Sequence, residues 1–248
     1  MTRASPLDPP PALSALLESG PVALFLDFDG TLVEIADQPD GITVPQTLAS
    51  ALEGLSRHLQ GRLAVVSGRS LEDLARHLGA ELQVAQAGSH GAARRQADGQ
   101  PLGEPPQGLS EETIAQLEGF AKAEGLRYEA KTHGGALHYR ENPEAGEAAH
   151  AFAKQLARAD GLALKTGKCV VELVQPGADK GSAVRAFMEL PHFSGATPIF
   201  VGDDVTDEDG FAACETLGGF GVLVGEPRES RARYALATVS ETHQWLDL

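Results

Sequence analysis

The sequence predicts an α/β protein in which a doubly wound parallel sheet carries a second, smaller α/β unit. Three observations support this fold class. Short apolar runs at 22–26, 63–66 and 199–201 have the length of buried strands, and polar residues follow each of them. Helical segments alternate with these runs, as they do in parallel sheets. From residue 110 this alternation gives way to a separate set of helices and strands.

Strand-then-helix order is clearest in the first part of the chain. Ser70 has the residue type of a helix N-cap, and Asp73 follows three residues later, as in a capping box. The Gly-, Pro- and Gln-rich stretch 98–108 predicts a linker. The elements expected before it are a strand at 22–26, a helix over 46–59, a strand at 63–66 and a helix over 71–78.

The middle of the chain is predicted to form a compact module of its own, with two helices on one face of a four-stranded antiparallel sheet. Its expected elements are a helix from 110, strands around 127–131 and 136–140, a helix over 143–159, and strands around 162–165 and 169–174. A Gln-Pro-Gly segment at 175–177 then returns the chain to the parallel sheet. There we expect a helix over 180–191, a strand from 199, a helix over 206–217, a strand at 220–224 and a C-terminal segment packed on the core through Trp245.

The N-terminus carries Arg3 and a Pro-rich stretch at 6–11, without the apolar segment of a secretion signal. We therefore expect a loose tail there. The predicted division of the chain is a flexible tail at 1–18, a core formed by 19–106 and 177–248, and an insert at 107–176.

Composition restricts the partners of this chain. A formal charge of -15 over 248 residues argues against nucleic acids and anionic membranes, which favour clustered Lys and Arg. The two cysteines, Cys169 and Cys214, are expected to be reduced thiols. No apolar run approaches the roughly twenty residues of a membrane helix. We expect a cytoplasmic monomer that binds a small molecule.

Two aspartates follow the first apolar run, in the segment Asp27-Phe28-Asp29-Gly30-Thr31. The end of a buried parallel strand would deliver their carboxylates to the edge of the sheet, where open α/β folds bind ligands. A plain surface turn is the alternative, because Asp and Gly favour turns. A calcium loop fits less well, since a third oxygen ligand and a flanking helix are missing.

Three further segments complete a possible phosphate and metal site. Ser67-Gly68-Arg69 follows the second apolar run, and Lys180 begins a helix after Asp179. The third run leads into an acidic segment over 203–208. Each segment is weak alone, and Ser67 by itself would suggest a cap or a turn. Their order, each at a strand end or a helix start, predicts a common site.

These motifs resemble those of the haloacid dehalogenase-like (HAD) phosphatases and, within them, of the trehalose 6-phosphate phosphatase family. The superfamily signature is Asp-x-Asp-Gly-Thr, followed by Ser or Thr, Lys and paired aspartates. The narrower resemblance rests on Gly-Lys-x-Val-x-Glu, Leu-His-Tyr-Arg and Gly-Asp-Asp-x-Thr-Asp-Glu. The matching stretches cover nearly the whole chain after the first twenty or so residues: 27–32, 66–69, 87–92, 136–140, 167–172, 179–181 and 202–208. The resemblance implies a Rossmann-like HAD core with an inserted α/β cap.

The resemblance also implies residue roles for Mg²⁺-dependent hydrolysis of a phosphate monoester. Asp27 would be the nucleophile that forms an aspartyl phosphate, and Asp29 the general acid and base. Phosphate oxygens would be bound by Thr31, Ser67 and Lys180. The magnesium ligands would be Asp27, the backbone carbonyl of Asp29, Asp203 and, directly or through water, Asp207. We expect Glu208 and Asp209 to be a solvated acidic helix start instead.

Substrate choice is expected to lie in the insert, where charged side chains can bind sugar hydroxyls. The candidates are Glu129, Lys131, Arg140, Lys168 and Glu172. Solvated strand charges in weak surface pairs are the alternative. His138 faces either these charges or the helices, and His90 is either a site residue or a packed loop residue. Ala93 and Gln175 depart from the family pattern, which has glutamate and a basic residue there.

Three functions remain open at this point. The first is hydrolysis of trehalose 6-phosphate, the last step of trehalose biosynthesis. The second is hydrolysis of another sugar phosphate, such as sucrose phosphate or mannosylglycerate phosphate; a phosphomutase is less favoured, because it must exclude water from its aspartyl phosphate. The third is a sugar-phosphate-binding regulator without catalysis, which would not need a second free aspartate.

Overall fold

The computed structural model describes residues 7–35, 41–104, 107–131, 133–167, 169–177 and 179–248. The chain forms two compact units. We call Met1–Glu104 together with Asp179–Leu248 the core unit, and Pro105–Ala178 the inserted unit. Lys168, one of the predicted sugar-binding residues, lies outside the described residues.

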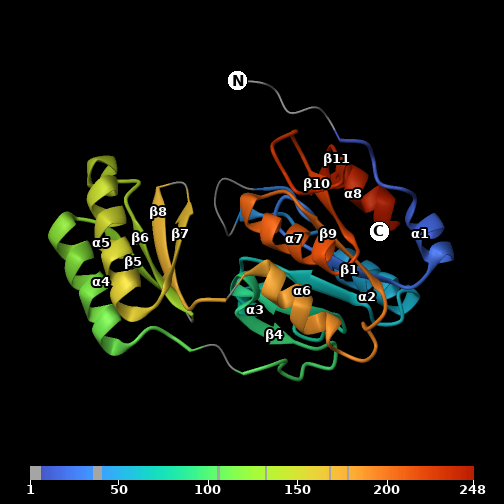
Figure 1. The fold of residues 1–248 in the computed structure, drawn as a ribbon, viewed down its shortest axis with the longest axis horizontal. Helices are drawn as coiled ribbons and strands as arrows, with labels where there is room; N and C mark the ends of the chain where they lie inside the picture. Colours follow the sequence, from blue (N-terminus) through green and yellow to red (C-terminus); the bar gives the residue numbers. More distant parts are fainter. Residues whose placement is uncertain (1–6, 36–40, 105–106, 132, 168, 178) are drawn as a thin grey trace. The chain divides into compact units, whose positions relative to one another are not determined.

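The core unit is built on a seven-stranded sheet of order β11-β10-β9-β1-β2-β3-β4, in which only β4 runs antiparallel. The strands are β1 Val22–Leu26, β2 Leu63–Val66, β3 Ala85–Gly88, β4 Ala93–Arg95, β9 Thr197–Gly202, β10 Phe220–Val224 and β11 Tyr234–Leu236. β1 lies between β2 and β9, so the strand order turns outward in both directions from it (Figure 1). Such a switch point is where doubly wound sheets bind ligands.

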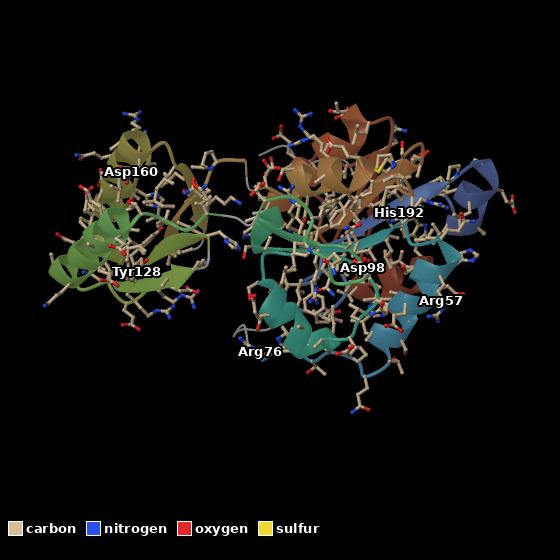
Figure 2. All side chains as sticks on the ribbon, turned by 90° about the horizontal axis from the view of Figure 1, so that it is seen from below. Arg57, Arg76, Asp98, Tyr128, Asp160 and His192 are labelled. Atoms are coloured by element: carbon tan, nitrogen blue, oxygen red, sulfur yellow. The ribbon has the colours of Figure 1, made fainter. Side chains whose placement is uncertain are left out.

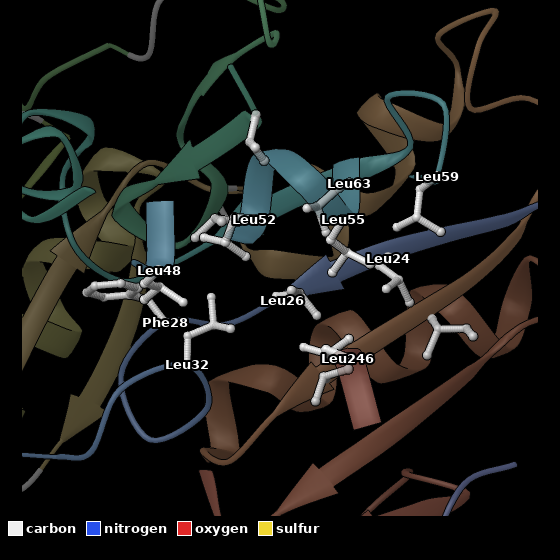
Figure 3. Close-up of a cluster of buried hydrophobic side chains, with 14 of the residues drawn as sticks. Leu24, Leu26, Phe28, Leu32, Leu48, Leu52, Leu55, Leu59, Leu63 and Leu246 are labelled. Carbon is white, nitrogen blue, oxygen red and sulfur yellow. The ribbon is translucent and has the colours of Figure 1, made fainter. Parts of the chain in front are cut away.

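Helices cover both faces of the core sheet. The side chains of β1 alternate, so that Leu24 and Leu26 join one apolar cluster while Phe25 joins another. Figure 3 shows the first cluster, to which α2 contributes Leu52. In the second, Phe25 packs against Phe187 of α6. The helices of this unit are α1 Leu13–Ser19, α2 Leu48–His58, α3 Leu71–Leu78, α6 Lys180–Met188, α7 Glu208–Thr216 and α8 Val239–Leu246, with short 3₁₀ turns at Ser89–Gly91 and Val205–Asp207.

The inserted unit is an antiparallel sheet of order β5-β6-β8-β7 with two helices on one face (Figure 1). Leu137 of β6 and Val171 of β8 pack against Leu117 and Leu156 of those helices. Its elements are α4 Glu111–Glu124, β5 Arg127–Lys131, β6 Gly134–His138, a 3₁₀ turn at Pro143–Ala145, α5 Gly146–Asp160, β7 Ala163–Gly167 and β8 Val170–Val174. This is the α/β module that the sequence predicts.

The N-terminal segment differs from the loose tail expected over 1–18. Within its described part, α1 forms and buries Leu13 against the core. Two hydrogen bonds tie the segment to the C-terminal part of the chain: Ala235 N–H donates to the Asp8 carbonyl at 3.0 Å, and Trp245 Nε1 donates to the Pro11 carbonyl at 2.8 Å. The prolines at 9–11 do not form a helix, because proline lacks a backbone N–H group. The carbonyls of this stretch are therefore available to accept these hydrogen bonds.

Three short strands of the core were not predicted. β3 and β4 contain Ala, Gln, Gly and Arg in place of a branched apolar run, and β11 has only three residues. Neither cysteine forms a disulfide: Cys169 and Cys214 are both free, as expected. Among the described residues, no helix is long and apolar enough to cross a membrane.

Candidate active site

In the loop after β1, the apolar side chains are buried in the core, and the polar side chains are left to form the candidate site. Phe28 and Leu32 are fully buried in the core cluster (Figure 3). The loop closes on itself through hydrogen bonds from the amides of Leu32 and Val33 to the Phe28 carbonyl, at 2.9 and 3.0 Å. Gly30 has φ +80°, and a Cβ there would lie 2.2 Å from Asp203 Oδ2. Glycine at this position therefore lets the Asp203 carboxylate lie directly on the loop.

Asp27, Asp203 and Asp207 form an acidic cluster in which one oxygen from each lies within 4.8 Å of the others. Lys180, the first residue of α6, reaches into this cluster. Its Nζ donates to Asp27 Oδ1 at 2.7 Å and to Asp207 Oδ1 at 2.6 Å, and all three side chains are buried. Asp179 caps α6 by accepting the Ser182 amide, which fixes where Lys180 begins the helix.

The cluster holds more negative charge than Lys180 can balance. Burial raises the pKa of Asp27 well above its ordinary value, and nearby Asp207 and Asp203 add to the rise. Burial likewise raises the pKa of Asp207, and burial with the charge of Asp207 raises that of Asp203 to about 6. Burial opposes the charge on Lys180, but the carboxylates of Asp27 and Asp207 outweigh it and raise the lysine pKa. When its three carboxylates are ionised, the cluster therefore has a net negative charge in spite of Lys180.

A divalent cation fits this donor set. Three carboxylates beside one ammonium group leave an excess of negative charge, and hard oxygen donors suit Mg²⁺. Asp203 Oδ1 is buried and has no hydrogen-bond partner within the described part of the chain. Asp207 differs, because its Oδ1 accepts from Lys180 and its Oδ2 accepts from the Asp204 amide at 2.8 Å. Asp27 and Asp203 are therefore the carboxylates best placed to bind a cation directly.

Two buried hydroxyls follow the neighbouring strands β1 and β2. Thr31 is fully buried, and its Oγ1 has no hydrogen-bond partner among the residues that the structure describes. An unsatisfied buried hydroxyl costs about 1–3 kcal/mol, so an oxygen-rich ligand would relieve it. Ser67 is also fully buried, and its Oγ accepts the Arg69 amide at 3.1 Å. Its hydroxyl hydrogen remains available to donate to a phosphate oxygen.

The loop that contains His90 packs on the Ser67 loop. The His90 amide donates to the Ser67 carbonyl at 2.9 Å, and the Ser89 amide donates to the Arg69 carbonyl at 2.7 Å. Ser89 and His90 both have left-handed backbone angles, with φ 50° and 56°. A Cβ at Gly68 would lie 2.7 Å from His90 Cε1, so the imidazole covers that glycine. Two consecutive non-glycine residues in this conformation are uncommon and require such support.

The Asp29 carboxylate is held by Arg69 and does not belong to the acidic cluster. Arg69 Nε donates to Asp29 Oδ2 and Arg69 Nη2 donates to Asp29 Oδ1, both at 2.7 Å. These hydrogen bonds raise the pKa of the Arg69 guanidinium above its already high value. This pair was not predicted from the sequence, although Arg69 lies within the Ser-Gly-Arg motif at the end of the strand beside β1.

Glu208 is not the solvated helix residue that was expected. Its Oε1 accepts from Arg228 Nη1, and its Oε2 accepts the Arg231 amide at 2.8 Å. Arg228 Nη2 also donates to the Asp204 carbonyl at 2.8 Å. The loop between β10 and β11 is thereby fixed to the acidic segment. No local pattern could indicate this contact, because it joins residues twenty positions apart in sequence.

In the inserted unit, the face of the sheet opposite the helices carries charged side chains. Lys131 Nζ donates to Glu172 Oε2 at 3.0 Å, and His138 Nε2 lies 2.6 Å from Glu129 Oε2. His138 therefore faces the charged side chains and not the helices. Glu172 also stands opposite Lys165 of β7 in the strand register. We call this set of side chains the charged face; its residues are Glu129, Lys131, His138, Lys165 and Glu172.

Arg140 does not lie on the strand where it was expected. β6 ends at His138, and Arg140 is exposed in the bend that follows. The preceding residue, Tyr139, turns its ring toward His150 of α5. The strand therefore stops two residues earlier than its predicted end.

Sequence comparison identifies close relatives of this chain. Residues 25–240 match the family model described as Trehalose-phosphatase. The chain is 38% identical over 246 residues to the "Trehalose-6-phosphate phosphatase" of Escherichia coli strain K12, covering 98% of this chain and 90% of that protein. It is 40% identical over 209 residues to a "Probable trehalose-phosphate phosphatase" of Sinorhizobium fredii, covering 83% of this chain and 78% of that one.

Solved structures share the fold. A trehalose-6-phosphate phosphatase related protein superposes with a TM-score of 0.68 at 26% identity, covering 91% of this chain and 95% of its own. The C-terminal domain of Candida albicans trehalose-6-phosphate phosphatase has a TM-score of 0.78 at 20% identity over the full length of both chains, which supports the fold alone. The predicted fold class and the predicted resemblance are both confirmed. The family match spans most of the chain, and the chain therefore belongs to the trehalose-phosphatase family of phosphoric monoester hydrolases.

Proposed function

We propose that this enzyme hydrolyses trehalose 6-phosphate to trehalose and phosphate, using Mg²⁺ and an aspartyl-phosphate intermediate on Asp27. The observation that carries the proposal is the buried contact of Lys180 with Asp27 at the carboxyl end of the sheet. Phosphate monoesters are among the slowest compounds to hydrolyse in water, and a carboxylate nucleophile divides that hydrolysis into two easier steps.

Positive charge is needed because the nucleophile and the substrate are both anions. Two unit charges of the same sign repel each other by about 4 kcal/mol at about 4 Å and an effective dielectric near 20. Lys180 contributes one positive charge, and its hydrogen bonds to Asp27 and Asp207 fix the position of its ammonium group. Mg²⁺ held by Asp27 and Asp203, with the Asp29 carbonyl as a further ligand, would supply more positive charge to the transferring phosphoryl group.

In the first step, an Asp27 carboxylate oxygen attacks phosphorus and the bond from phosphorus to the sugar oxygen breaks. Asp29, as general acid, gives its proton to the departing sugar oxygen. Thr31, Ser67 and Lys180 bind the phosphoryl oxygens. In the second step water attacks phosphorus, Asp29 accepts a proton from that water, and the bond between Asp27 and phosphorus breaks. Free phosphate and both starting carboxyl groups result.

We propose that the inserted unit, for which the sequence predicts the bounds 107–176, is the cap that selects the sugar. Its charged face supports this role, because ionised side chains bind hydroxyls more strongly than neutral groups do. Glu172 is held by Lys131 in a strand, so its orientation is fixed before a ligand arrives. We include Arg140 and Lys168 among the sugar-binding candidates on the family resemblance alone. A cytoplasmic, monomeric enzyme with a small-molecule substrate completes the proposal.

The test is phosphate release from a panel of sugar phosphates, with Mg²⁺ and after exhaustive chelation. We expect trehalose 6-phosphate to be the preferred substrate and chelation to abolish its hydrolysis until Mg²⁺ is restored. Preference for sucrose phosphate or mannosylglycerate phosphate would favour the second function. Binding of the sugar phosphate without turnover would favour the regulator. Full activity in the chelated enzyme would contradict the metal assignment.

Mg²⁺ is also expected to raise the melting temperature of the protein, which provides a test independent of activity. A cation that binds only the folded state stabilises it, by about 2.7 kcal/mol at a 100-fold excess over its Kd. For a chain of this length that corresponds to a rise of roughly 5–10 °C. Calorimetry of chelated and Mg²⁺-loaded protein would measure it.

Asp203→Asn should lose most of that rise, because it removes a proposed ligand. Asp98→Asn is the matched control, since Asp98 lies in a hairpin turn where it accepts the Gln100 amide. Superimposable melting curves with and without Mg²⁺ would count against the cation site.

A further inference from the structure

Arg69 is bound on both sides of its guanidinium group. One edge donates two hydrogen bonds to Asp29, and Nη1 donates to Asp73 Oδ2 at 2.7 Å. Its side chain is only 10% exposed, and its Cζ lies 5.8 Å from the centre of the buried Phe28 ring. All three guanidinium nitrogens therefore already donate to a carboxylate, so the group is held between Asp29 and Asp73.

The anchor on the far side of Arg69 is itself well fixed. Asp73 lies in the first turn of α3, and its amide is capped by Ser70 Oγ at 3.1 Å. His77, one turn later, places its Nε2 3.3 Å from Arg69 Nη1. The guanidinium therefore occupies one position, defined by a helix start, an aromatic ring and a carboxylate.

Asp29 needs such support more than the other aspartates of the site. Its side chain is 34% exposed, whereas those of Asp27 and Asp207 are buried. An exposed aspartate would sample several rotamers, and only some of them direct the carboxylate at a reacting group. A planar guanidinium fork binds both oxygens and fixes the plane of the carboxylate, which a lysine ammonium cannot do.

We propose that Arg69 is a positioning residue that orients the Asp29 carboxylate for proton transfer, with Asp73 as its anchor. The inference rests on the proposed function, in which Asp29 serves as general acid and base. Arg69 does not touch the substrate in this proposal. Its contribution is the orientation of a group that must be aligned with the sugar oxygen and then with the attacking water.

The test compares Arg69→Lys with the unmodified enzyme on two substrates. On trehalose 6-phosphate, kcat should fall about 10- to 100-fold with little change in KM, because alignment is lost while binding is kept. On p-nitrophenyl phosphate, the first turnover should keep its rate, since nitrophenolate is stable as an anion and leaves without a proton. Later turnovers should slow, because the attack of water still requires Asp29. Rapid-mixing absorbance measurements separate these phases.

Arg76→Lys is the matched control. Arg76 lies on α3 (Figure 2) and also binds Asp73, at 3.1 Å, but its side chain is 71% exposed and bonds to Asp73 rather than to Asp29. It should behave as the unmodified enzyme. Asp73→Asn should reproduce the kinetic effect of Arg69→Lys in a milder form. This substitution keeps the backbone amide of residue 73 that Ser70 caps. It therefore replaces Arg69→Lys as the test if that variant folds poorly.

Equal slowing of the first and later turnovers would overturn the proposal, because it would indicate a phosphate contact or a damaged fold. Unchanged kinetics of Arg69→Lys, beside an inactive Asp29→Asn, would overturn this inference alone. If Asp29→Asn itself keeps its activity on trehalose 6-phosphate, the acid and base role in the proposed function fails. The two failures are thus distinguishable.

Discussion

Asp27→Asn is expected to abolish turnover of trehalose 6-phosphate and to leave the fold intact. The amide has almost the volume of the carboxylate, but it cannot attack phosphorus as an anion. The substitution removes one of three clustered carboxylates that repel each other, so we expect no loss of stability in metal-free protein. Lys180 keeps its bond to Asp207, which prevents a fully unpaired buried ammonium group.

Steady-state phosphate release and thermal unfolding of the purified variant would measure these two effects. Asp98→Asn again serves as the control for a neutralised aspartate outside the site. A melting temperature near that of the unmodified protein would show that any loss of turnover is chemical. Measurable hydrolysis by Asp27→Asn, free of contaminating phosphatase, would refute the assignment of the nucleophile.

The motifs of the candidate site could be predicted because each follows an element with a strong local pattern. β1 is a run of five fully apolar residues, and its predicted bounds agree with the structure. The helix over 71–78 was also predicted with its bounds and with Ser70 as its cap. The carboxyl ends of neighbouring parallel strands necessarily lie at one edge of a sheet. The proximity of Asp27, Ser67 and Asp203 could therefore be predicted from the sequence alone.

Contacts between side chains were much less predictable. The bond between Arg69 and Asp29 joins the ends of two strands and depends on rotamers that no spacing specifies. Glu208 had the pattern of a solvated helix start, yet a distant arginine neutralises it. The short strands β3 and β4 lack branched apolar residues and form because β2 offers an edge to extend. In each case tertiary packing overrode the local signal.

Glu172→Gln is expected to lower kcat/KM for trehalose 6-phosphate by about 10- to 100-fold, and to change hydrolysis of a small aryl phosphate little. A hydrogen bond to a charged group typically contributes about 1.5–3 kcal/mol. Glu172 is 14% exposed and is held by Lys131 at 3.0 Å, so its carboxylate is oriented in advance. Glutamine keeps the shape and removes the charge.

The contrast between the two substrates is what tests the role of the charged face. Binding energy from the non-reacting glucose can be used to orient the phosphate for attack, so losing it lowers turnover as well as affinity. A small aryl ester has no second sugar and therefore no such contact to lose. Glu147→Gln, an exposed glutamate in the first turn of α5, is the matched control within the same unit. An equal fall on both substrates would instead indicate a folding defect or a role in the chemistry itself, and recognition of the sugar by the charged face would then be rejected.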